Sequence, residues 1–194
     1  LYKRCIHDLL ARSEHKLRDG ADLAWDQWHS SNGDENLRAV ARLAGSALSD
    51  VESVGERLLV EEEKLLAALP TDWPAQPPSG LTTFTAQQSF VRWLAGAAGL
   101  LNEPKDGLYE FAHQSLQEYL AAVHLDAEHR DASSKATEVL RRSKYEHQWD
   151  VLIYWAGIMS ESGVAALDVV LGGLISAEGL GLDLAGIIFA EGLG

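Results

Sequence analysis

The residues in this chain that could do chemistry do not assemble into a common catalytic pattern. A phosphate-binding loop requires the sequence G-x-x-x-x-G-K-[ST], in which backbone amides and the lysine hold the phosphates. None of the six lysines follows a glycine, and none precedes a serine or a threonine. These 194 residues therefore contain no phosphate-binding loop.

Possible metal ligands and nucleophiles are equally scattered. The sequence has no C-x-x-C and no H-E-x-x-H pattern, and the pair His124 and His129 lacks the further ligands of a tetrahedral zinc site. No serine lies in a G-x-S-x-G motif. Cys5 falls on the apolar side of a predicted helix, where a thiol acts as a small hydrophobic group. We therefore expect no enzyme activity, no metal and no small-molecule substrate for this segment.

The charge of the chain argues against two classes of partner. The formal net charge is -13, which repels phosphate backbones and anionic lipid heads, so we expect neither nucleic acid nor membrane as a partner. The tight basic group is Arg141, Arg142 and Lys144, which we interpret as a solvated helix end. A single cysteine excludes an intramolecular disulfide and favours the cytoplasm.

Hydrophobic periodicity predicts helices over most of the chain. Apolar residues at helical spacing mark a first helix that fades near Asp19-Gly20, and a turn is expected at 30–34 between polar residues. A further helix is expected from a capping box at Ser49 to about Leu69. The stretch 70–80 contains four prolines, which cannot sustain a helix, so it is a loop or a subdomain junction.

The middle of the chain predicts a helix, a hairpin and a second helix. A capping box at Thr85 opens a helix whose buried face includes Phe90 and Trp93. Two short apolar runs flank the turn residues 104–107, which is typical of a β-hairpin. Leu116, Leu120 and Val123 then recur at helical spacing. This order is compatible with a winged-helix-like unit.

Beyond Ala132 the pattern is a succession of short helices without strands, which suits the start of an α-solenoid. Six tryptophans accompany these elements. Three lie within predicted helices and are expected in the core: Trp93, Trp149 and Trp155. Three lie in polar or proline-rich surroundings and could cover a subdomain interface or form an aromatic ligand platform: Trp25, Trp28 and Trp73.

The stretch Tyr109–Ala122 (YEFAHQSLQEYLAA) resembles a signature of NACHT-type signalling NTPases, F-x-H-x-[ST]-[FL]-Q-E-[YF]-[LF]-A-A. These are switch ATPases of the STAND class, and they include animal NOD-like receptors with bacterial and fungal relatives. The match is long and ungapped, and a helix and a hairpin precede it as in that family. Weaker similarity at Leu1–Leu10 and Trp149–Leu152 extends the resemblance over about residues 1–160.

The resemblance implies a mainly α fold with one small β-hairpin. A helical subdomain would occupy residues 1–75, a winged-helix-like subdomain 81–130, and a helical region 131–194, which would be the truncated start of a solenoid. Both ends of the chain look cut, so the NTPase core, with its bound ADP or ATP and magnesium, would precede Leu1. The partners implied are that core and other subunits on activation, in cytoplasmic signalling for innate immunity and antiviral defence.

By motif match, His113 is the residue that would reach the phosphates of ADP in the resting state. Its place at a helix start suits a phosphate, because free amides give a positive potential there. The alternative is a core histidine that serves packing alone. Gln117, Glu118 and Tyr119 are expected to be structural.

Two other functions stay open on the sequence. One is a winged-helix nucleic-acid-binding regulator, although the helix over 85–98 offers only Arg92 as a basic residue for a phosphate backbone. The other is a plain helical-repeat scaffold without a switching role.

Overall fold

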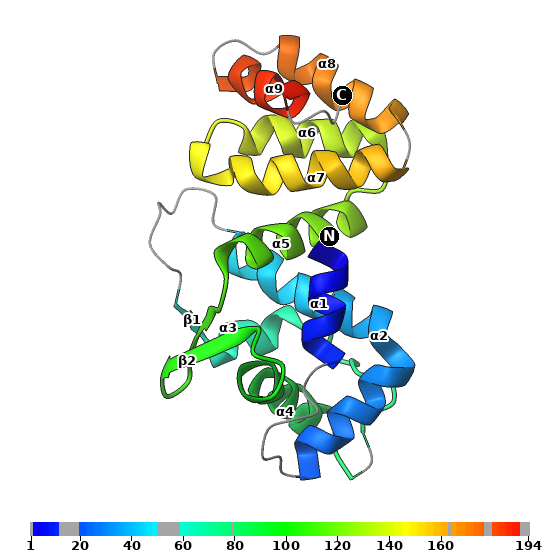
Figure 1. The fold of residues 1–194 in the computed structure, drawn as a ribbon, viewed down its shortest axis with the longest axis vertical. Coiled ribbons are helices and arrows are strands. Elements are labelled where there is room, and N and C mark those ends of the chain that lie inside the picture. Colours follow the sequence, from blue (N-terminus) through cyan, green and yellow to red (C-terminus); the bar gives the residue numbers. More distant parts are fainter. Residues whose placement is uncertain are drawn as a thin grey trace. The chain divides into compact units, whose positions relative to one another are not determined.

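The computed structural model describes residues 2–11, 20–49, 59–78, 80–162, 164–176 and 180–190. The chain forms two compact units. The first consists of Leu1–Ala47 and Arg57–Gln117, and the second of Leu48–Glu56 and Glu118–Gly194. Both are built mainly from α-helices, and a small antiparallel sheet lies in the first (Figure 1). The fold class expected from the sequence is confirmed.

Four helices form most of the first unit, and α2 contacts the other three. They are α1 (Tyr2–Ala11), α2 (Gly20–Ala47), α3 (Glu62–Ala68) and α4 (Thr83–Gly96). The turn expected at 30–34 is wrong, because α2 runs through it with a kink at Asn32 (φ -132°, ψ 33°). The Asn32 side-chain amide donates to the carbonyl of Trp28 at 2.9 Å. Apolar residues on both sides of the kink, including Trp25 and Leu37, are buried, so packing holds the helix across the polar stretch.

The sheet has three strands in the order β1-β3-β2. They are β1 (Val60–Glu61), β2 (Leu101–Lys105) and β3 (Leu108–Phe111). Tyr109 pairs with Val60 on one side of β3, and Phe111 pairs with Leu101 on the other. The predicted hairpin is confirmed. Its turn is tighter than expected, because the chain reverses at Asp106-Gly107, where Gly107 has a φ of 69° that favours glycine.

Strand β1 was not predicted, because the sequence indicated a helix as far as Leu69. Residues 50–58, which include the first part of that helix and most of its capping box, lie outside the described residues. Val60 is 5% exposed and pairs with β3, so the sheet begins before the predicted start of the winged-helix-like subdomain at residue 81. The last part of the predicted helix forms the short α3, which has seven residues.

Helix α4 begins one turn earlier than the sequence indicated. Its capping box joins Thr82 and Thr85: the Thr82 hydroxyl accepts from the Thr85 amide at 3.3 Å, and the Thr85 hydroxyl accepts from the Thr82 amide at 2.9 Å. The predicted inner face is confirmed, since Phe90, Trp93 and Leu94 are each fully buried.

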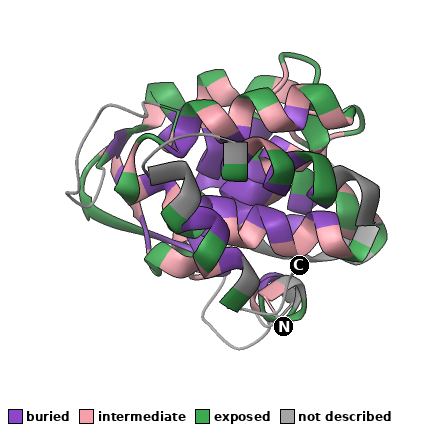
Figure 2. Cartoon of the chain, turned by 90° about the horizontal axis from the view of Figure 1, so that it is seen from above, coloured by how far each residue is buried: buried purple, intermediate pink, exposed green. Residues whose placement is uncertain are grey.

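The second unit is a succession of helices, as expected beyond Ala132. It holds most of α5 (Gln114–Glu128), then α6 (Ala132–Arg142), a 3-10 turn (Glu146–Gln148), α7 (Trp149–Ser162), α8 (Val164–Ser176) and α9 (Leu180–Ala190). Helix α8 contacts α6, α7 and α9. Many helices of the chain carry buried residues on one side and exposed residues on the other (Figure 2). No helix among the described residues is long and apolar enough to cross a membrane.

Candidate functional site

His113 lies between the last residue of β3 and the first residue of α5. The backbone on either side is fixed by hydrogen bonds. The Ala112 amide donates to the carbonyl of Leu100 at 3.0 Å, which extends the hairpin pairing by one residue. The carbonyl of His113 accepts from the amides of Leu116 and Gln117, both at 3.2 Å, and so begins the hydrogen-bond series of α5.

The side chain of His113 is exposed. A buried core histidine, the alternative considered from the sequence, therefore does not describe this residue. The imidazole precedes a helix whose first turn carries no acidic residue, so the positive end of the α5 dipole is not neutralised from within the helix. An exposed imidazole beside such a helix start can donate a hydrogen bond to an anion.

The residues around His113 in the signature are mostly buried. Tyr109 is 2% exposed, Gln117 9% and Glu118 6%, so each takes part in packing the polar and apolar core. Burial raises the pKa of Tyr109 to about 12, and the carboxylates of Glu103 and Glu62 add to the effect. This burial supports a structural role for Gln117 and Glu118, whereas Tyr119 is half-buried.

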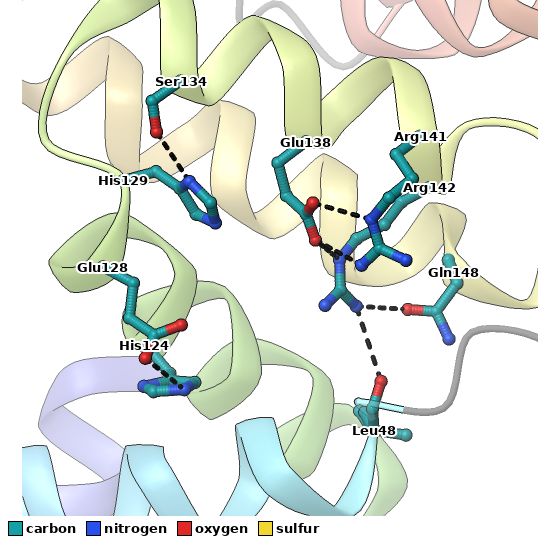
Figure 3. A network of polar contacts seen from close by, with 9 residues as sticks. All are labelled: Leu48, His124, Glu128, His129, Ser134, Glu138, Arg141, Arg142 and Gln148. Carbon is teal, nitrogen blue, oxygen red and sulfur yellow. Dashed lines mark hydrogen bonds and ion pairs between the residues drawn. The ribbon is translucent and has the colours of Figure 1, made fainter.

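The two histidines once considered as a metal pair have separate partners (Figure 3). His124 Nε2 lies 3.5 Å from Glu128 Oε1, and His129 Nδ1 lies 2.7 Å from the hydroxyl of Ser134. Among the described residues, no group of three or more His, Cys, Asp or Glu side chains could hold a metal ion. The histidines thus join neighbouring turns and helices of the second unit.

A buried cation stands at the C-terminal end of α6 (Figure 3). The Arg142 guanidinium donates to Glu138 at 2.6 Å and to Gln148 at 2.8 Å, and a longer contact of 3.5 Å reaches the carbonyl of Leu48. Arg142 is 6% exposed, so the expectation of a solvated helix end is wrong for this residue. Arg141 also binds Glu138, and Glu138 therefore balances two cations.

A second ion pair, between a buried lysine and a half-buried aspartate, was missed by the sequence reasoning. The Lys135 ammonium bonds to Asp126, and the Trp155 indole donates to the same carboxylate oxygen at 3.1 Å. The three residues lie on α6, α5 and α7, so only packing brings them together. The pairing of Glu138 with Arg142 does have a sequence signal, because the two are four residues apart on one helix.

The hairpin between α4 and α5, with α4 before it, defines a winged-helix unit. Residues 82–125 match the family model described as the winged helix-turn-helix domain C-terminal to NACHT. The matched stretch includes α4, both strands of the hairpin, His113 and most of α5. The resemblance to the region that follows a NACHT core is thus confirmed over these residues. No significant match was found among curated proteins or among solved structures.

Proposed function

We propose that this chain is the regulatory segment of a NACHT-type signal-transduction ATPase. In this proposal it docks on the ADP-bound core of its own protein and favours the closed, monomeric state. Nucleotide exchange and ligand sensing release it and permit assembly with other subunits. The wider setting is cytoplasmic defence signalling, as in NOD-like receptors.

The observation that carries the proposal is the exposed His113 at the start of α5, inside the matched winged-helix segment. An imidazole in this position is free to meet a ligand that another part of the protein holds. Buried signature residues on both sides of it, Phe111 on β3 and Leu116 on α5, pack the hairpin and the helix against the core. A sensor residue acts by contacting the nucleotide in one state and not in the other, because this difference in contact supplies the free energy of switching.

The nucleotide and magnesium would be held by the NTPase core, which supplies phosphate chemistry that this chain lacks. From this chain, His113 would donate a hydrogen bond to a phosphate oxygen, and the amides of the first turn of α5 would add positive potential. The donor set fits a phosphate in charge and exposure.

The test is the substitution His113→Ala in the full-length protein. A charge-assisted hydrogen bond contributes about 1.5–3 kcal/mol, so ADP retention should weaken by about 10- to 100-fold and basal oligomerisation should rise. ADP occupancy is measured on the purified protein and the oligomeric state by light scattering. The matched control is Asn102→Ala, which changes an exposed residue on β2. Unchanged ADP occupancy and oligomeric state in His113→Ala would remove the sensor role.

The winged helix-turn-helix family name also favours a nucleic-acid-binding function, which is the second candidate. Helix α4 precedes the hairpin, as a recognition helix would, and its one basic residue, Arg92, is exposed. A gel shift with nonspecific duplex at low salt distinguishes the two, because phosphate binding is strongest there. Binding that Arg92→Ala abolishes would support the second candidate.

A further inference from the structure

We draw no further inference here: the strongest candidate, the surface patch of α8 that carries the exposed apolar side chains of Val169 and Ile175, is an apolar helix face, and nothing in the part of the chain that the structure describes shows what covers it.

Discussion

Arg142 and Glu138 illustrate how single residues of this chain combine burial with charge. Their spacing on α6 could be recognised in the sequence, but the burial of Arg142 could not, because Gln148 and Leu48 come from other segments. Breaking a buried ion pair is costly, since the remaining charge loses both its partner and its water. The pair therefore makes a strong local test of the structure.

Glu138→Gln should destabilise the protein by about 3 kcal/mol at pH 7, because Arg142 would stay buried without a counter-charge. Burial acts to raise the pKa of Glu138, but hydrogen bonds from Arg141 and Arg142 outweigh it and hold the pKa at about 2, below the ordinary value of 4.5. A lowered folded-state pKa gives stability that is complete above the ordinary value and is lost as the pH falls toward 2. The difference in the free energy of unfolding between wild type and Glu138→Gln should therefore decrease as the pH falls toward 2.

Urea unfolding at pH 7 and at pH 3 measures both effects. The matched control is Glu146→Gln, which changes an exposed carboxylate near the same helix end. It should leave stability nearly unchanged at both pH values. A Glu138→Gln variant as stable as wild type at pH 7 would show that Glu138 and Arg142 do not form a buried pair in solution.

A single hydroxyl group, that of Thr82, caps the N-terminus of α4. Thr82→Ala removes the hydroxyl that accepts from the Thr85 amide, and loss of such a cap costs about 1 kcal/mol. Thr82→Ser keeps the oxygen and should recover most of that stability. Chemical denaturation of both variants is the measurement. Equal stability of the alanine and serine variants would mean that the cap contributes nothing.

Elements with a regular apolar pattern could be predicted from the sequence, and those held by distant contacts could not. Helix α5 was predicted from the helical spacing of Leu116 and Leu120, and both side chains are buried in the structure. Strand β1 has only two residues, and its partner β3 lies almost 50 positions further on, so no local pattern marks it. The same limit applied to α2, whose polar residues near Asn32 resemble a turn.

The candidate site was located by its motif, while its geometry required the structure. The sequence placed His113 at the junction of a strand and a helix, which is correct. His113 lies just before the first residue of α5, so the helical spacing of apolar residues in α5 does not extend to it. That spacing therefore does not indicate whether the imidazole faces the core or the solvent. Exposure of His113 therefore could not be derived from periodicity.

The molecule as a whole divides into two compact units, and each contains buried apolar residues. The proline-rich stretch 70–80 was interpreted as a loop or a subdomain junction, and the segments on both sides of it belong to the first unit. Packing of Trp73 against Trp25 and Phe90 explains this, because the irregular segment is itself part of the aromatic core. The unit boundaries at 47–48, 56–57 and 117–118 carry no cluster of proline or glycine.

Because each unit buries apolar residues of its own, a destabilising substitution in one unit should leave hydrogen exchange in the other unit unchanged. Leu174 on α8 is fully buried, and Leu174→Ala should cost about 2–5 kcal/mol through lost burial and the cavity that remains. Val169 on the same helix is 47% exposed, so Val169→Ala is the matched control and should change stability little. Amide hydrogen exchange in Leu174→Ala should then accelerate at α7, including Leu152, while the amide of Phe90 in α4 keeps its wild-type rate. Equal acceleration at Leu152 and Phe90 would mean that the two units unfold as one.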